Sequence, residues 1–159
     1  MDEKPKAKKI YDKKAAKPKI EYYCAYQERS QQEVRDKLYD MGLHKSDVEE
    51  LISELIQTNF INEERFAMIF ARGKLRMKHW GKIKIKQHLK IKKVSDYCIK
   101  KALNSLDHDE YLEIIQKEIE KKSKLIKAKN PYIAKQKVQL YLQSRGFELD
   151  IIQDLLKNT

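Results

Sequence analysis

The sequence predicts an all-α protein: an elongated, curved stack of three tandem three-helix repeats, preceded by a disordered basic N-terminal arm. Glycine and proline are scarce, with 4 Gly and 3 Pro in 159 residues. No alternating run rich in Val, Ile and Thr is present, so strands lack both their residues and their turns. In addition, helix-capping side chains recur along the chain, and one apolar pattern occurs three times.

Residues 1–19 form the predicted arm. They are rich in Lys, contain Pro5 and Pro18, and include only Ile10 and Tyr11 as bulky apolar residues. Such a segment buries too little apolar surface to offset the entropy lost on ordering. We therefore expect the arm to be disordered and the first helix to begin after it.

Capping residues divide the rest of the chain into helices. Ser, Asp or Asn at an N-cap accepts a hydrogen bond from a free backbone N–H group, and Glu three residues after Ser completes a capping box. Candidate N-caps are Ser30 and Ser46, each with such a Glu, and Asn62, Ser95, Asp107 and Asn130. Gly42 and Gly146 fit helix C-termini. The predicted helices are 20–28, 31–41, 47–58, 63–79, 82–91, 96–105, 108–128, 131–145 and 148–157.

A threefold repeat groups these helices into triplets. The matching positions are Val34, Leu38, Leu43, Val48, Leu51 and Ile52; then Ile85, Leu89, Val94, Ile99, Ala102 and Leu103; then Val138, Leu142, Phe147, Ile152, Leu155 and Leu156. All are apolar in a chain that is 41% hydrophobic, which makes chance agreement a poor explanation. The predicted repeats are 20–60, 61–106 and 107–159. Each is too small to be stable alone, so neighbours must bury apolar surface together.

The sequence disfavours an enzyme and predicts no metal and no other cofactor. It contains no phosphate-cradling Gly loop and no nucleophile elbow. The four histidines are isolated from one another, which suits surface or packing roles. Cys24 and Cys98 lie in apolar helical patterns without a nearby ligand partner, so we expect reduced thiols in the core.

No apolar stretch approaches the ~18 residues of a membrane span, and the N-terminus lacks the apolar segment of a secretory signal. Attachment to a membrane surface by a basic amphipathic helix is disfavoured, because the apolar faces are needed by the repeat core. We therefore expect a cytoplasmic protein without a membrane partner, and a monomer.

Positive charge is concentrated in residues 72–93, which carry ten Lys and Arg and no Asp or Glu, within a net charge of +11. Arg72, Arg76 and His79 follow i, i+4, i+7 spacing, and Lys74 and Lys78 form a neighbouring row. Such a run can be a solubilising face or a phosphate-binding face. The absence of acids favours phosphate binding, because solubilising faces normally mix both signs.

Three local patterns leave alternatives open. Lys and Ile alternate over 82–86, which suits a strand, but the repeat register favours a helix. Residues 117–137 carry eight Lys against two Glu, so phosphate binding and a solvated face are equally supported there. Tyr132 and Tyr141 could stack on bases, although packing and surface cover are favoured.

A motif at the start of the second repeat resembles the RecX regulatory family. It reads Phe60-Ile61-Asn62-Glu63-Glu64-Arg65-Phe66-Ala67, with Arg72 and Gly81 after it. Upstream, Arg29-Ser30, Glu33 and Lys37-Leu38 with Gly42 are similar to the family's first repeat. The resemblance covers about residues 22–157 and includes the three-repeat helical fold. The chain departs from the family at Lys78-His79-Trp80-Gly81 and at Lys93, where many members have Gly.

The resemblance implies a bacterial protein that binds RecA filaments on single-stranded DNA and inhibits RecA ATPase, strand exchange and coprotease activity, modulating recombination and DNA repair. The candidate RecA or DNA contacts are Arg65, Arg72, Lys74, Arg76, Lys78, Lys82, Lys84 and Lys86. Arg65 has a second interpretation, as a structural partner of an acid in the first repeat. The alternative function is a sequence-independent DNA- or RNA-binding accessory protein without a RecA partner.

Overall fold

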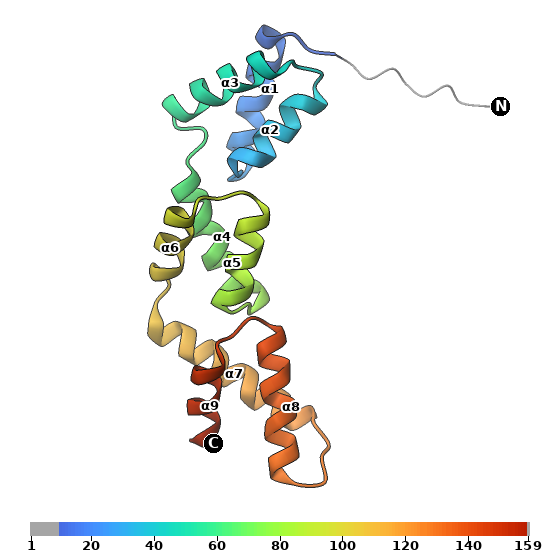
Figure 1. Cartoon of the computed structure of the whole chain (residues 1–159), viewed down its shortest axis with the longest axis vertical. Helices are drawn as coiled ribbons and strands as arrows, with labels where there is room; N and C mark the ends of the chain where they lie inside the picture. Colours follow the sequence, from blue (N-terminus) through green and yellow to red (C-terminus); the bar gives the residue numbers. More distant parts are fainter. Residues whose placement is uncertain (1–9, 159) are drawn as a thin grey trace, which may run out of the picture. The chain divides into compact units, whose positions relative to one another are not determined.

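The computed structural model of the chain describes residues 10–158. Their regular secondary structure is entirely helical, which confirms the predicted all-α class (Figure 1). The nine helices of this range are α1 Lys13–Tyr26, α2 Gln31–Asp40, α3 Lys45–Gln57, α4 Glu63–Lys78, α5 Lys82–Ile91, α6 Asp96–Asn104, α7 His108–Leu125, α8 Pro131–Ser144 and α9 Leu149–Lys157. None of these helices is long and apolar enough to cross a bilayer.

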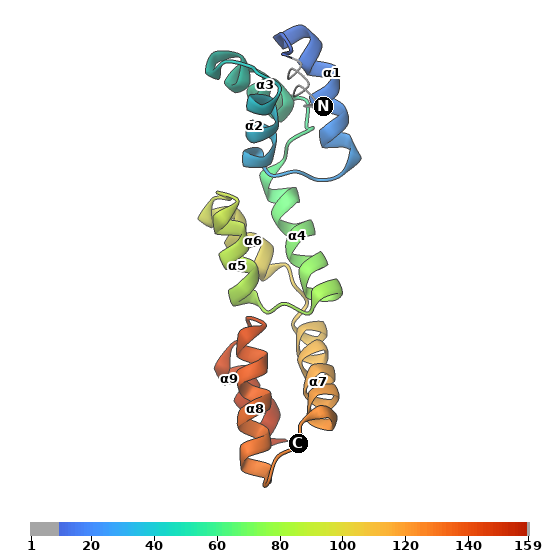
Figure 2. The same ribbon diagram turned by 90° about the vertical axis from the view of Figure 1, so that its right-hand side faces the viewer.

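The chain divides into two compact units, Met1–Phe66 and Ala67–Thr159, here called unit 1 and unit 2. In unit 1, α1, α2 and α3 pack on one another around a shared apolar core. In unit 2, α5 packs on α6, and α7, α8 and α9 form a second mutually packed group (Figure 2). Each of these groups follows the helix order that the repeat predicts.

Helix α1 corrects the predicted boundary of the arm. It begins at Lys13, so residues 13–19 are helical rather than disordered, while residues 1–9 lie outside the described part of the chain. The Asp12 carboxylate caps the helix by accepting a hydrogen bond from the Ala15 N–H at 2.7 Å. Just before it, the Tyr11 N–H donates to the Met41 carbonyl at 2.9 Å. The chain is therefore anchored well before Lys19.

Pro18 lies inside α1. Proline cannot donate to the carbonyl four residues earlier and therefore disfavours the interior of a helix. Burial outweighs this cost: Ala16 and Ile20 are fully buried and Cys24 nearly so, at a spacing of i, i+4, i+8. The apolar stripe on one face of α1 explains why the helix extends through the proline.

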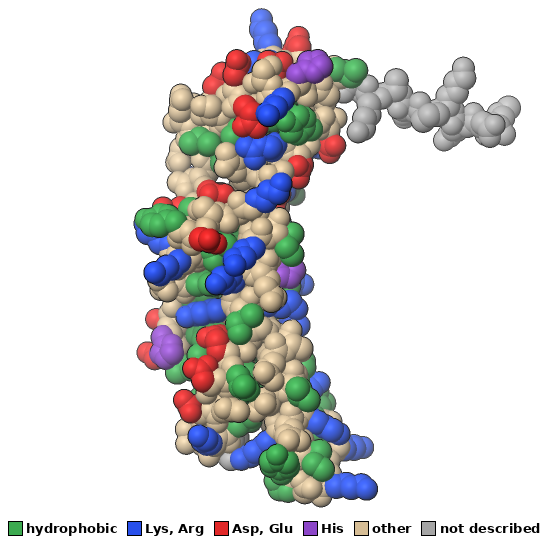
Figure 3. Space-filling model, viewed as in Figure 1, with side chains coloured by type: hydrophobic (Ala, Val, Ile, Leu, Met, Phe, Trp, Pro, Cys, Tyr) green, Lys and Arg blue, Asp and Glu red, His purple; other side chains and the backbone are tan. Residues whose placement is uncertain are grey.

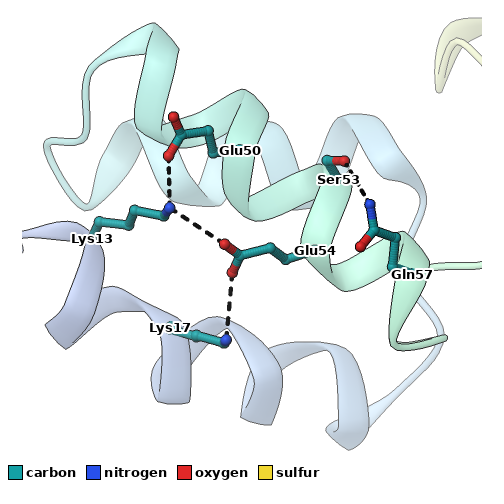
Figure 4. A network of polar contacts seen from close by, with 6 residues as sticks. All are labelled: Lys13, Lys17, Glu50, Ser53, Glu54 and Gln57. Atoms are coloured by element: carbon teal, nitrogen blue, oxygen red, sulfur yellow. Dashed lines mark hydrogen bonds and ion pairs between the residues drawn. The ribbon is translucent and has the colours of Figure 1, made fainter.

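Ion pairs also hold α1 against α3 (Figure 4). The Lys13 ammonium lies 2.6 Å from a Glu50 oxygen and 3.3 Å from Glu54, and Lys17 lies 3.4 Å from the other Glu54 oxygen. The hydrogen bond to Glu50 raises the pKa of Lys13, and the bond from Lys13 lowers the pKa of Glu54. These lysines of the predicted arm thus belong to the folded surface of unit 1.

The threefold repeat is visible in the packing and in the turns. Of its eighteen apolar positions sixteen are buried, and only Leu103 and Leu155 are half-buried. The turns after α2, α5 and α8 are closed by the same backbone bond, from Leu43 to Leu38, Val94 to Leu89 and Phe147 to Leu142. The residue before each donor has positive φ: 86° at Gly42, 58° at Lys93 and 92° at Gly146. The expected glycine C-termini are confirmed.

Most predicted N-caps are confirmed by hydrogen bonds from the backbone three residues later: Ser30, Asn62, Ser95, Asp107 and Asn130. Ser46 is an exception, because α3 already begins at Lys45 after His44, which makes no side-chain cap.

Both cysteines are free and buried, as expected. Burial raises the pKa of the Cys24 thiol to about 11.

Within unit 2, the start of α5 is capped by the third triplet. The Gly81 N–H donates to the Arg145 carbonyl at 2.8 Å, and the Ile83 N–H to the Gly146 carbonyl at 3.0 Å. The Lys82 N–H donates to the Tyr111 hydroxyl at 3.0 Å, and this hydroxyl in turn donates to Glu148. The first N–H groups of α5 therefore have protein partners, which fixes the orientation of this basic helix.

Candidate nucleic-acid interface

Trp80, in the turn between α4 and α5, lies within cation–π distance of two lysine ammonium groups. The Nζ of Lys74 is 4.9 Å from the centroid of the indole, and the Nζ of Lys84 is 4.7 Å from it. The ring of His88 lies 4.4 Å from the indole, centroid to centroid, at 42°. Lys74 comes from α4 and the other two from α5, so the turn brings both helices to one aromatic side chain.

Phe70 and Lys92 extend this arrangement. Lys74 also lies over the Phe70 ring, 5.4 Å from its centroid, and Lys92 lies over the same ring at 5.7 Å. The six side chains are half-buried. We call them the Trp80 cluster: Phe70, Lys74, Trp80, Lys84, His88 and Lys92.

The electrostatic effect of the cluster is seen at His88. Partial burial lowers the pKa of its imidazole, and the charges of Lys84, Lys74 and Lys92 lower it further. The three ammonium groups and partial burial thus make this ring harder to protonate. Within the described residues, no carboxylate is in ion-pair distance of Lys74 or Lys84. Cations beside aromatic faces suit phosphates and bases.

Arg76 of the basic block pairs with an acid in the first turn of α7. The Arg76 guanidinium makes a two-pronged bond to Glu110, with Nε at 2.6 Å and Nη2 at 3.1 Å from the two oxygens. The bond from Arg76 lowers the pKa of Glu110, and the charge of Arg72 adds to the effect. Arg76 is therefore neutralised within the protein by an acid from outside residues 72–93, which weakens the case for phosphate binding at this position.

His79, at the end of the same helical face, is paired with Glu118 of α7. The Tyr141 hydroxyl donates to the other oxygen of Glu118 at 3.3 Å, and Lys122 lies 4.3 Å from the Tyr141 ring. Tyr141 is thus part of the packing between α7 and α8.

Tyr132, the other tyrosine considered for base stacking, is 70% exposed and accepts a hydrogen bond from Gln136 at 2.9 Å.

The remaining lysine candidates have neighbours outside the Trp80 cluster. Lys82 lies over the Tyr111 ring at 5.0 Å, close to the cap of α5. Lys86 lines a shallow pocket between α5 and α6 together with Asp96 and Lys100. Lys78 is exposed at the end of α4, and its carbonyl accepts a hydrogen bond from Arg145. The segment 82–86 is helical, as the repeat register predicts.

Arg65 has a structural role in unit 1, the second of its two predicted interpretations. Its Nε donates to Glu28, just after α1, at 2.5 Å, and its Nη2 donates to the Asn59 carbonyl at 3.1 Å. The guanidinium therefore ties the start of α4 to two loops of the first triplet. Such a bidentate arrangement suits arginine better than lysine.

Of the eight predicted contact residues, the structure brings only Lys74 and Lys84 together at an aromatic surface. Lys and Arg side chains are also visible over the α4–α6 region in the face shown in Figure 3, interspersed with other side chains. Sequence reasoning missed Phe70, Trp80, His88 and Lys92 as members of the site. The spacing Lys84, His88, Lys92 (i, i+4, i+8) carried a signal, because it places all three on one face of a helix.

Comparisons with known proteins match all three triplets in order. Residues 16–55, 62–103 and 109–156 match the family models "RecX, first three-helix domain", "RecX, second three-helix domain" and "RecX, third three-helix domain". These matches together cover most of the chain.

Whole-chain comparisons agree. Regulatory protein RecX of Bacillus velezensis is 30% identical over 92% of this chain and 56% of its own length. Regulatory protein RecX of Streptococcus uberis is 32% identical over 83% of this chain and 50% of its own length. The chain thus spans about half the length of these curated relatives. The crystal structure of RecX from Lactobacillus salivarius is similar with a TM-score of 0.85 and 25% identity, over 92% of this chain and 95% of that one. The chain belongs to the RecX family of regulatory proteins.

Proposed function

We propose that the chain binds RecA filaments on single-stranded DNA and inhibits RecA ATPase, strand exchange and coprotease activity. The observation that carries this proposal is the ordered match of all three triplets to the RecX domains. The protein acts by binding rather than by catalysis, as a monomer in the bacterial cytoplasm, and thereby modulates recombination and DNA repair.

The Trp80 cluster is the proposed DNA contact. The Lys74, Lys84 and Lys92 ammonium groups neutralise phosphates, and displacement of the counterions of DNA drives binding. The aromatic ring of Trp80 holds two of these ammonium groups at 4.7–4.9 Å, which limits their motion before DNA arrives. Such contact is independent of base sequence and weakens as salt rises.

Co-sedimentation with RecA filaments tests the proposal. RecA filaments assembled on single-stranded DNA are pelleted with the parent protein or with the pair Lys74→Gln and Lys84→Gln. We expect the parent to pellet with the filaments and the double variant to pellet more weakly. Lys45→Gln with Lys157→Gln, which removes the same charge at two exposed positions outside both basic blocks, is the control and should resemble the parent. Absence of the parent from the filament pellet contradicts RecA binding.

A second candidate function is sequence-independent binding of DNA or RNA without RecA, and the combination of cations and aromatic rings around Trp80 favours it. The charge reversals Lys74→Glu and Lys84→Glu distinguish the two. Simple coating of phosphates should be almost abolished by both reversals together. Filament binding should retain the part of its affinity that comes from contacts with RecA.

A further inference from the structure

A second aromatic and cationic surface lies in unit 1, outside the predicted contact residues. It is a groove of about 660 Å³ along α1 and the facing side of α2. Four tyrosines line it: Tyr11, Tyr22, Tyr23 and Tyr26. We call it the tyrosine groove. It belongs to the first triplet alone, whereas the Trp80 cluster belongs to unit 2.

Two of these tyrosines are displayed to solvent. Tyr22 and Tyr26 are one helical turn apart on α1, and 70% and 71% of their surface is exposed. Their ring centroids lie 6.3 Å apart at 33°, within the range of aromatic contact. They contribute little to the core of the triplet, and together they present a continuous aromatic surface. Contiguous exposed aromatic surface is typical of binding sites.

Cationic side chains lie at the other two tyrosines of the groove, Tyr23 and Tyr11. The Arg29 guanidinium carbon lies 3.9 Å from the centroid of Tyr23, and its Nε donates to the Tyr23 carbonyl at 3.2 Å, which holds the side chain in place. Lys37 of α2 lies 5.6 Å from the same ring. Lys19 lies 5.3 Å from the Tyr11 ring. Against these three cations the lining contains one acid, Asp40.

We propose that the tyrosine groove binds single-stranded DNA, with bases stacked on Tyr22 and Tyr26 and phosphates near Arg29, Lys37 and Lys19. The choice of DNA rests on the proposed function, which places the chain on single-stranded DNA. Aromatic faces combined with a positive groove are the two components by which proteins hold single strands without sequence preference. A duplex offers no free base faces to the tyrosines.

Charge argues against the chain's own N-terminal residues as the occupant. Residues 1–9 carry four Lys and two acids, so the groove would repel them. An acidic peptide fits the cations but gives the two exposed rings no planar partner. Bases supply that partner, since each has a π-face.

The test measures binding of a fluorescently labelled oligothymidylate by anisotropy, without RecA, over a series of salt concentrations. The variant is Tyr22→Ala with Tyr26→Ala in the full chain. We expect its affinity to fall at least about tenfold, since stacking contributes substantially for each base. The slope of log K against log salt should stay as in the parent, because no phosphate contact is removed.

Three controls accompany the variant. Tyr22→Phe with Tyr26→Phe retains the rings and should bind like the parent. Tyr97→Ala removes a tyrosine of similar exposure, 67%, from α6 and should have no effect. Circular dichroism and thermal melting of the Tyr22→Ala, Tyr26→Ala protein should match the parent, because both side chains lie largely outside the core.

The proposal is overturned if the alanine pair binds oligothymidylate as tightly as the parent, or if it loses equal affinity for a blunt duplex. It is also overturned if a polyglutamate peptide binds the parent but not the alanine pair while DNA binding is unchanged, which would make the occupant an acidic peptide. Inhibition of RecA is measured in a separate assay, so loss of that activity and loss of the groove's DNA binding are distinguishable.

Discussion

Gly81 and Gly146 meet backbone to backbone in unit 2: a Cβ atom added to Gly81 would lie 2.2 Å from the Gly146 carbonyl oxygen. A Cβ on Gly146 would lie 2.3 Å from the Cβ of Lys84. Only glycine allows this approach, and the approach allows the Gly81 and Ile83 N–H groups to donate to the third triplet. Two residues without side chains thus set the position of α5 and of its Lys84.

The first prediction concerns this contact. Gly81→Ala should lower the free energy of unfolding by about 2–4 kcal/mol, because the added methyl group forces the backbones apart and weakens their hydrogen bonds. Urea denaturation measures the change. Gly73→Ala is the matched control: its Cβ meets nothing within 4 Å, and it lies inside α4. That variant should be more stable by about 0.5–1 kcal/mol. Equal stability of the Gly81→Ala protein and the parent contradicts the account.

The second prediction concerns Lys93, which has φ of 58° at the turn position occupied by Gly42 and Gly146 in the other repeats. Lys93→Gly removes the free-energy cost of a left-handed backbone at a residue with a Cβ atom, but it also makes the unfolded chain more flexible. We expect a net gain in the free energy of unfolding of about 0.5–1 kcal/mol. Lys90→Gly, three residues earlier inside α5, should instead lose about 1 kcal/mol. If Lys93→Gly and Lys90→Gly lower the free energy of unfolding equally, the left-handed backbone at Lys93 does not strain the folded protein.

The third prediction separates the lysines at Trp80 from the paired Arg76. Each of Lys74→Gln and Lys84→Gln should weaken binding to single-stranded DNA and reduce the salt slope by up to ~0.7, the value for one lost phosphate contact. Arg76→Gln should reduce the slope less, because Glu110 already neutralises this guanidinium in the free protein. Anisotropy titrations at several salt concentrations provide the slopes. Identical slopes for all three variants count against a DNA site centred on Trp80.

The fourth prediction concerns acid. Bonds from Lys13, Arg35 and Arg76 lower the pKa values of Glu54, Glu49 and Glu110 below the ordinary 4.5. These carboxylates therefore take up protons more readily in the unfolded chain than in the folded protein. The stabilisation that the ion pairs give is complete above pH 4.5, and it is lost as the pH falls through the lowered pKa values of the folded protein.

Glu54→Gln should flatten the decline of stability between about pH 5 and 3, and high salt should reduce its effect because the pair is at the surface. Urea titrations at several pH values measure both. Glu120→Gln is the control, because Glu120 belongs to none of these ion pairs. Its free energy of unfolding should depend on pH as that of the parent does. A decline of the same steepness in the Glu54→Gln protein contradicts the role assigned to the pair.

Features encoded locally were predictable from the sequence. The caps at Ser30, Asp107 and Asn130 need only residues three positions apart, and the buried repeat positions follow a pattern of spacing. The start of α1 was missed because Pro18 and the lysines around it indicate an unfolded segment when considered alone. Their partners, Glu50 and Glu54, are more than 30 residues away.

The candidate site was predicted only in part for the same reason. Helical spacing correctly identified a basic segment, but it could not show that α7 supplies Glu110 to neutralise Arg76. Nor could it show that the α4–α5 turn brings Lys74 and Lys84 to the same indole. Both facts depend on how helices converge in three dimensions.

The proposed regulation of RecA is tested most directly by the DNA-dependent ATPase rate of RecA on single-stranded DNA as the protein is added. We predict that the rate falls at substoichiometric ratios. Lys74→Gln with Lys84→Gln should shift the titration to higher ratios, whereas the control pair Lys45→Gln with Lys157→Gln should not. An ATPase rate that stays constant at every ratio of the parent protein to RecA would contradict the proposal.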